Sequence, residues 1–532
     1  MKKKLLKAAQ KRAEKKEALD RFTFRQLGKQ LPLTFPEADL PEGQERSPKR
    51  RYRSDYRYGG FSRLRTKDAW RDASPFTLAT LLFDYSNLEP LLAAHLYRRS
   101  AKGQVPFHPV SMVLLSLYRH QEHLSRPEVL RRLRNRQEGR LLRRQMGFGD
   151  EIPSESGLRY VESRISPQLQ QEINALQIDA LYQAGLLPTQ PKAQQRVSLS
   201  FDGMLHQARS RMRCAHVQAS CYQPAPRPCR AQLKGKRGCS CQGEACAQRC
   251  RHAPARDPDA RLIAYTGNKR RKDDNPNTSQ KEQSDKKRAR RFVYGYYSYC
   301  GQLLDDELAT YWALPAAFGA ATTGDRTLFP ENLSYLRQRF SWLQLDAVLA
   351  DAGAGYDNCL DLIWEAGAWR LVDMLGHSTD ADPAAQLLRG YNDKGHPLCP
   401  FGYPMRSNGH DYKRRRAKWR CAKGCLRKPA DERRDCAYLD ESRKHGFTTT
   451  VGRTHADGSV RLAREVAYGS DRWKQLYGRR NCAESRNSVL ERLGLKRMPV
   501  HGLAACHVTI LQADFIANQL TLIRLMREAS AL

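Results

Sequence analysis

Two aspartates follow segments that predict β-strands. Segment 196–205, RVSLSFDGML, alternates apolar residues with a period of two and carries Asp202 at its end, before a glycine. Segment 345–351 is a second apolar run, and Asp351 closes it directly before Ala-Gly-Ala-Gly-Tyr. An aspartate after a strand is most often a turn or helix-cap residue. However, α/β folds place their sites at strand ends, where such carboxylates meet solvent.

A third carboxylate, Glu484, belongs to a predicted helix that is rich in arginine. Tyr477, Arg480 and Glu484 follow one another at spacings of three and four residues, so they share one helix face. Alone, Glu484 would be an ordinary salt-bridge partner. With Asp202 and Asp351 it could hold Mg²⁺ or Mn²⁺, because hard divalent cations prefer oxygen ligands. Two such ions can activate a water or hydroxyl and stabilise the leaving oxygen of a phosphodiester, while Arg480 and Tyr477 hold the phosphate.

The charge of the chain points to a polyanionic partner. Its 532 residues carry a formal net charge of +36, which favours nucleic acid. The longest apolar candidate, 504–526, is interrupted by polar residues and predicts an amphipathic or buried helix rather than a membrane span. The N-terminus, MKKKLLKAAQKRAEKKE, lacks the apolar core of a signal peptide. We therefore expect a cytoplasmic protein with no membrane partner and with reduced cysteines.

Strands alternate with helices beyond residue 196, which predicts an α/β core with some parallel strands. The strands are expected at 196–205, 292–300, 343–353, 368–375 and 447–453, and the helices at 330–341, 356–367 and within 468–526. The region before this core has helical spacing instead. Its helices are expected at 77–97, 109–121, 127–137 (behind a Ser-Arg-Pro-Glu capping box) and 154–165.

These patterns divide the chain into five expected parts. They are a basic N-terminal arm (1–75), a helical DNA-binding or dimerisation domain (76–190), the first part of the core with a Cys-rich basic insertion at 207–291 (191–390), a Cys-rich zinc-knuckle-like insertion (391–445), and the second part of the core with the glutamate helix (446–532).

The segment YGRRNCAESRNSVLERLG at 477–494 resembles the Tyr-x2-Arg-x3-Glu-x6-Lys signature of DDE-type bacterial insertion-sequence transposases. Its Tyr, Arg and Glu positions fit, and the lysine position is Glu491, for which Lys496, Arg486 or Arg492 could substitute. The stretches DAGAGYDN at 351–358 and LSFDG at 199–203 resemble the two aspartate motifs of the same family. The helical region 107–165 resembles its N-terminal domain. The resemblance touches most of residues 75–525.

The resemblance implies a ribonuclease H-like core, a mixed sheet in which Asp202, Asp351 and Glu484 hold Mg²⁺ or Mn²⁺. It implies an enzyme that cleaves element ends and joins the 3′-hydroxyl to target DNA by phosphodiester hydrolysis and transesterification. Tyr477, Arg480 and Lys496 would contact phosphate, and the arginines of the glutamate helix would line the DNA. The expected partners are double-stranded DNA, from element ends and target, and a second copy in a homodimer associated with the bacterial nucleoid.

Two groups of cysteines suggest zinc. Four thiolates at 399, 421, 425 and 436 (Cys399, Cys421, Cys425 and Cys436) would suffice for a tetrahedral site, with His410 as a further candidate. Similar Cys-containing insertions occur in related transposases. A second group places seven cysteines between 214 and 250, and its spacing does not assign ligands. We expect Cys300, Cys359, Cys482 and Cys506 to be buried as small apolar residues.

Two other functions fit part of the sequence. One is a catalytically inactive DNA-binding regulator derived from a transposase, which Glu491 favours and the three carboxylates oppose. The other is an RNA-binding protein that clamps folded RNA with basic arms and zinc knuckles, for which the α/β core with its carboxylates has no evident use.

Overall fold

The computed structural model describes most of the expected helical domain and parts of the expected α/β core. It covers residues 13–23, 31–35, 52–57, 72–97, 104–189, 191, 195–210, 257, 259–266, 290–373, 396–399, 402–411, 416–422, 448–451 and 471–531. The cysteine group at 214–250, Cys425 and Cys436 lie outside these residues.

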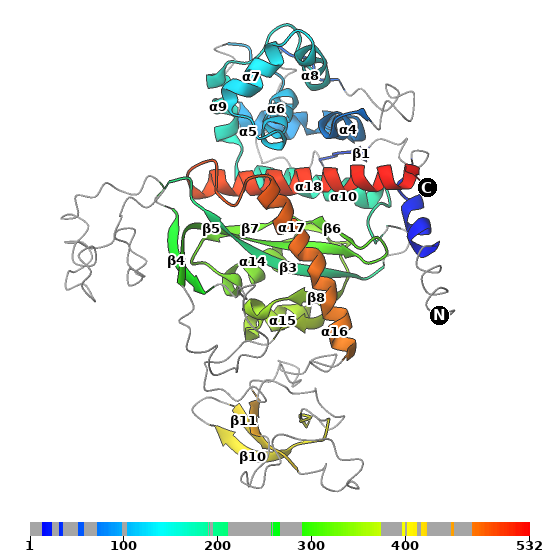
Figure 1. The fold of residues 1–532 in the computed structure, drawn as a ribbon, viewed down its shortest axis with the longest axis vertical. Helices are drawn as coiled ribbons and strands as arrows, with labels where there is room; N and C mark the ends of the chain where they lie inside the picture. Colours follow the sequence, from blue (N-terminus) through cyan, green and yellow to red (C-terminus); the bar gives the residue numbers. More distant parts are fainter. Residues whose placement is uncertain are drawn as a thin grey trace, which may run out of the picture.

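The centre of the fold is a seven-stranded mixed sheet (Figure 1). Its path runs β4–β5–β3–β8–β9, and β6 and β7 also pair with β5. The strands are β3 (Val197–Gln207), β4 (Arg261–Thr266), β5 (Arg290–Asp305), β6 (Thr310–Ala313), β7 (Ala317–Ala320), β8 (Leu345–Ala350) and β9 (Trp369–Val372). β3, β8 and β9 are parallel, whereas β5 runs antiparallel to β3. The prediction of an α/β protein with a mixed sheet is confirmed.

Two strands differ from their predicted extents. β4 comes from the segment expected to be an insertion, and it joins the edge of the main sheet beside β5. β3 continues to Gln207, so Asp202 lies inside the strand and not at its end. The glycine after it does not terminate the strand. A Cβ at Gly203 would lie 1.8 Å from the Tyr297 hydroxyl, so glycine is needed there for the close approach of this side chain from β5.

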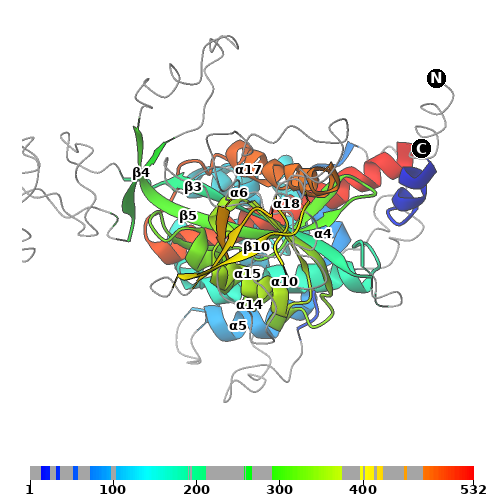
Figure 2. The same ribbon diagram turned by 90° about the horizontal axis from the view of Figure 1, so that it is seen from below.

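Helices cover both faces of the sheet, and the side chains of β3 alternate between them. Phe201 packs on one face against Phe329 of α14 (Asp325–Arg339), with a ring distance of 4.8 Å, and α15 (Asp357–Glu365) covers the same face. Met204 belongs to the opposite face, with α16 (Asp471–Tyr477), α17 (Asn481–Arg492) and the start of α18 (Leu503–Ala531). Figure 2 shows α17 and α14 on opposite sides of the strands.

The N-terminal part is helical, as predicted. It contains α4 (Pro75–Leu82), α5 (Glu89–Leu96), α6 (Pro109–Gln121), α7 (Arg126–Arg134), α8 (Glu138–Met146), α9 (Glu155–Arg164) and α10 (Pro167–Gln183). The predicted capping box forms at Ser125 and Glu128. The single helix expected at 77–97 is instead two, because Phe83–Asp84 forms a short strand, β2, against β1 (Leu31–Pro32), and Asp84 accepts a bond from the Ser86 amide that turns the chain.

α18 and α10 form a layer between the N-terminal helices and the sheet (Figure 1). Buried polar side chains join the two: Asn174 donates to the Leu511 carbonyl at 2.7 Å, and Gln177 donates to the Phe515 carbonyl at 3.1 Å. The buried-helix prediction for 504–526 is therefore confirmed. Among the described residues, no helix is long and apolar enough to span a membrane.

A separate three-stranded antiparallel sheet lies at the far end of Figure 1 from the N-terminal helices. Its strands are β10 (Arg406–Asp411), β11 (Arg416–Arg420) and β12 (Thr448–Val451). The strand expected at 447–453 thus forms, but it pairs with β11 and not with the main sheet.

One ion pair fixes α17 inside the protein. The Arg486 guanidinium donates to both carboxylate oxygens of Asp514 on α18, at 2.7 and 2.9 Å, and both side chains are fully buried. Arg486 therefore does not line a DNA surface, contrary to the expectation for the arginines of this helix. The spacing of the arginines did not reveal this, because the buried acid that selects Arg486 lies on another helix.

We expect Arg486→Met to lower the free energy of unfolding by about 3–5 kcal/mol, because it leaves the Asp514 carboxylate buried without its partner. The double variant Arg486→Met/Asp514→Leu should recover most of this loss. Arg159→Met, which removes a pair with Glu155 whose side chains are 66% and 44% exposed, is the matched control and should change stability by less than about 1 kcal/mol. Urea unfolding of the four proteins measures this, and equal losses for Arg486→Met and Arg159→Met would contradict it.

Candidate functional site

The register of two parallel strands brings the two predicted aspartates together. Ser200 of β3 pairs with Leu349 of β8, so two residues further along Asp202 and Asp351 lie opposite one another. Asp202 is 9% exposed, and its neighbour Met204 on the same strand face packs toward α17. Asp351 follows β8, and its carboxylate accepts the Gly353 amide at 3.0 Å, which starts a short 3-10 turn.

Arg480 links the two carboxylates. Its Nη2 lies 2.9 Å from Oδ1 of Asp202 and 3.9 Å from Oδ2 of Asp351. Tyr477, one turn earlier, is stacked on Trp473 with a ring distance of 4.4 Å. Burial raises the pKa of Tyr477 to about 12, so its hydroxyl remains protonated at neutral pH and can donate a hydrogen bond.

Glu484 lies on the same helix stripe as the residues that bind Asp202. Arg480, Glu484 and Asn487 are spaced four and three residues apart, and Asn487 Nδ2 donates to Oδ2 of Asp202 at 2.7 Å. Burial raises the pKa of Asp202, Arg480 opposes this shift, and the charge of Glu484 adds to it. Glu484 is exposed. The three predicted carboxylates therefore share one region, with Asp202 and Asp351 adjacent and Glu484 at its solvent side.

Asp325 is a carboxylate of this region that the sequence did not reveal. It begins α14, and Tyr297 of β5 donates to its Oδ1 at 2.5 Å. A Cβ at Gly353 would lie 1.8 Å from Asp325 Oδ2 and 3.0 Å from Asp351 Oδ1, so this glycine lets the two carboxylates approach from either side. Burial and the charges of Asp351 and Asp202 raise the pKa of Asp325 to about 6. In the sequence, Asp325 looks like any acid in a first helical turn.

A fourth aspartate extends the row along the sheet. Val372 of β9 pairs with Ala350 of β8, and the Asp373 amide donates to the Ala350 carbonyl at 3.1 Å. Asp373 therefore follows β9 as Asp351 follows β8, and its charge helps raise the pKa of Asp351 after the larger contribution of burial. Asp202 thus lies in β3, Asp351 follows β8 and Asp373 follows β9, and these three strands are parallel neighbours.

The donor set of this region suits a hard divalent cation. Besides burial, the charges of Asp351 and Asp202 raise the pKa of Asp325, and the charge of Asp202 helps to raise the pKa of Asp351. Arg480 is the cation in contact with Asp202 and Asp351. Such a group is short of positive charge, although the whole chain carries +36. In the arrangement described, however, no three His, Cys, Asp or Glu side chains within the described ranges are placed to hold a metal ion.

Lys496, which is predicted to contact phosphate, pairs with Glu491 in the structure. Its ammonium lies 3.0 Å from Oε1 of Glu491, and both side chains are more than half exposed. The residue at the signature's lysine position thus pairs with the lysine proposed to replace it. The Lys496 carbonyl accepts the Gln207 amide at 2.8 Å, so this loop is joined to the end of β3.

The zinc prediction is only partly within the described residues. Cys399 is buried and Cys421 is partly exposed, whereas Cys425 and Cys436 lie outside. The backbone of His410 lies in β10. The burial predicted for Cys300, Cys359 and Cys506 is confirmed, since all three are fully buried. The side chain of Cys482, for which burial was also predicted, lies outside the described residues.

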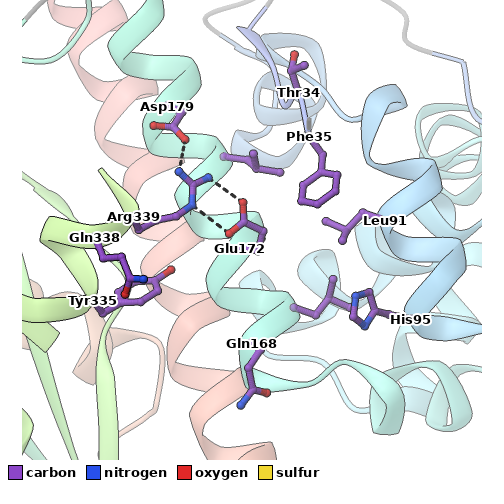
Figure 3. A pocket seen from close by; sticks show the side chains of 12 residues that line it. Thr34, Phe35, Leu91, His95, Gln168, Glu172, Asp179, Tyr335, Gln338 and Arg339 are labelled. Carbon is purple, nitrogen blue, oxygen red and sulfur yellow. Dashed lines mark hydrogen bonds and ion pairs between the residues drawn. The ribbon is translucent and has the colours of Figure 1, made fainter. Parts of the chain in front are cut away.

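A cleft of about 680 Å³ lies elsewhere, between α5, α10 and α14 (Figure 3). Apolar side chains such as Phe35 and Leu91 face it on one side. On the other side, Arg339 donates to Glu172 at 2.7 Å and to Asp179 at 2.8 Å. Its charged groups pair with one another, and the carboxylates of the candidate site are not part of its lining.

Comparisons of the chain with protein-family models, with curated proteins and with solved structures found no match.

We expect the Asp325 carboxyl to make stability depend on pH. A raised pKa means that the folded protein holds this proton more tightly than the unfolded chain does. The stabilisation is therefore fully present below pH 3.8 and is lost as the pH rises through about 6. At about 1.36 kcal/mol per pKa unit, discounted for partial exposure, the free energy of unfolding of wild type relative to Asp325→Asn should fall by about 2 kcal/mol between pH 4 and pH 7.

Urea unfolding in EDTA at the two pH values measures this difference. Tyr297→Phe is the matched control: it removes the hydroxyl that lowers the pKa of Asp325, so it should make the fall larger. Parallel pH profiles for wild type and Asp325→Asn would show that the carboxyl titrates normally.

Proposed function

We propose that this protein is a DDE-type DNA transposase that cleaves the ends of a mobile element and joins them to target DNA. One observation carries the proposal: the β3–β8 register places Asp202 opposite Asp351, and Arg480 of the Tyr-Arg-Glu segment contacts both. These residues are far apart in the sequence and were selected from it for one chemistry. The mixed sheet is, in this proposal, a ribonuclease H-like core.

The proposed metal ligands are Asp202, Asp351 and Glu484. When bound, Mg²⁺ or Mn²⁺ would activate the attacking oxygen and stabilise the leaving oxygen of the phosphodiester. Glu484 is the ligand that has to approach the other two, and its exposed side chain on the Arg480–Asn487 stripe leaves it free to rotate.

The remaining residues of the site orient the DNA. Arg480 carries a guanidinium that suits a phosphate oxygen, and the protonated hydroxyl of Tyr477 can donate a second bond. In the first step, the oxygen of a water attacks phosphorus and the bond to the 3′ oxygen breaks, which leaves a 3′-hydroxyl on the element. In the second step, that 3′ oxygen attacks a target phosphorus and the target's own 3′ oxygen leaves. Neither step requires a nucleophile from the protein.

The N-terminal helices are the proposed contact with element ends. Not every arginine there is available, because Arg119 and Arg126 both donate to Glu162, at 2.7 and 2.6 Å. Arg131, Arg134, Arg136, Arg140 and Arg144 are exposed on or beside α7 and α8. A homodimer would place two such surfaces on a pair of element ends, and zinc in the Cys399 region remains part of the proposal.

We expect Glu484→Gln to lower the rate of end cleavage at least about 100-fold while duplex binding is kept, because the change removes charge from the site and leaves the helix intact. The assay uses a labelled duplex that ends in the element's own inverted repeat, with Mg²⁺, Mn²⁺ or EDTA. EDTA should abolish cleavage by wild type. Glu365→Gln, which alters an exposed carboxylate at the end of α15, is the matched control and should cleave like wild type. A wild-type protein that binds the duplex but cuts in neither metal would favour the inactive DNA-binding regulator.

We expect Arg136→Gln/Arg140→Gln to weaken duplex binding and to flatten its salt dependence. Each phosphate contact contributes a slope of about −0.9 to the plot of log K against log salt, so the double variant should reduce the slope by about 1.8. Fluorescence anisotropy from 50 to about 200 mM salt measures it. Arg337→Gln, exposed on α14, should leave the slope unchanged. Competition by structured RNA with higher affinity than duplex DNA would favour the RNA-binding function.

A further inference from the structure

Asn487 holds the more buried carboxylate of the site from the side opposite to Arg480. Arg480 donates to Oδ1 of Asp202 at 2.9 Å, and Asn487 donates to Oδ2 at 2.7 Å. The two donors flank Glu484, four residues after one and three residues before the other. Both oxygens of Asp202 are thus fixed by the helix that carries the third proposed ligand.

The other half of the Asn487 amide is unsatisfied. Its Oδ1 is buried and has no hydrogen-bond partner in the described part of the chain. Native proteins rarely leave a buried amide oxygen without a partner, because the hydrogen bonds that it loses to water are then not replaced. Reversing the amide would not solve the problem, because the oxygen would then face the Asp202 carboxylate and repel it.

An amide oxygen is itself a ligand for hard cations, and the Asn487 amide lies against the Asp202 carboxylate. Carboxylate, carbonyl and water oxygens suit Mg²⁺ and Mn²⁺. Within the described ranges, no three His, Cys, Asp or Glu side chains are placed together to hold a metal ion. The amide of Asn487 is an oxygen donor of a type outside that set, and its nitrogen already contacts Asp202.

We infer that Asn487 is a positioning residue of the metal site, which orients Asp202 through Nδ2 and offers Oδ1 to the hydrated divalent cation. The inference rests on the proposed function, since it assigns a further residue to the same site. This role accounts both for the unpartnered Oδ1 of Asn487 and for the two hydrogen-bond donors that hold Asp202. It also makes the segment from Arg480 to Asn487 a unit in which three successive side chains of one stripe serve the same two aspartates.

The test is Mn²⁺ binding by the full-length protein without DNA, followed by the EPR signal of free Mn²⁺. Asn487→Ala should weaken Mn²⁺ binding by about 10-fold to 100-fold, the usual effect of removing a group that orients a metal ligand. Ser488→Ala is the matched control, because this exposed hydroxyl donates to the Glu484 carbonyl within α17. Its Mn²⁺ affinity should stay within twofold of wild type.

Asn487→Asp provides a readout that a purely structural residue would not give. It replaces the donor to Asp202 with a carboxylate, so without metal its Tm should fall by about 2–4 °C, and saturating Mn²⁺ should raise its Tm more than that of wild type. If wild type binds Mn²⁺ and Asn487→Ala binds it equally well, the inference is wrong while the proposed function stands. If wild type binds no Mn²⁺ with or without duplex DNA, both are overturned.

Discussion

The buried ion pair between Arg486 and Asp514 is the contact on which the position of the candidate site depends. It ties α17 to α18, and α18 is in turn bonded to α10 by buried amide side chains. α17 carries Glu484 and Asn487, and Arg480 ends the 3-10 turn directly before this helix. The bidentate bond of Arg486 prevents α17 from rotating about its axis. The residues that contact Asp202 are therefore held in place by an ion pair that has no chemical role itself.

The candidate site is locally acidic, whereas the chain as a whole is strongly basic. A protein with a formal charge of +36 concentrates aspartates at the ends or in the middle of three adjacent parallel strands. Long-range attraction draws a polyanion toward the surface, whereas the local field beside Asp202, Asp351 and Asp325 repels it. Cations resolve the conflict, and in the arrangement described Arg480 is the one in contact. In the proposed function, a bound divalent cation would supply further positive charge at this point.

The sequence predicted the elements better than it predicted which side chains meet. Helical spacing and the Ser125–Glu128 capping box are local patterns, and α6, α7 and α9 formed where they indicated. The helix expected at 77–97 is interrupted by β2, whose pairing partner is distant in the chain. Asp351 was placed correctly because an apolar run followed by glycines ends a strand. The prediction that Asp202 ends a strand was wrong, because Gly203 was taken as a turn residue. Gly203 is instead required by the close approach of Tyr297 from the neighbouring strand. Asp325 and the buried state of Arg486 depend on partners more than 25 residues away in the chain, and no local pattern encodes them.

The two central aspartates differ in how firmly the backbone holds them. Asp202 lies within a strand that is paired on both sides at its start and with β5 along its length, so its backbone is fixed and only its side chain can adjust. Asp351 stands where the strand gives way to a 3-10 turn, and 45% of its side chain is exposed. The site thus pairs one rigid carboxylate with one compliant carboxylate. Asp202 then keeps a fixed position in the sheet, and Asp351 can move when the distance between two bound charges changes.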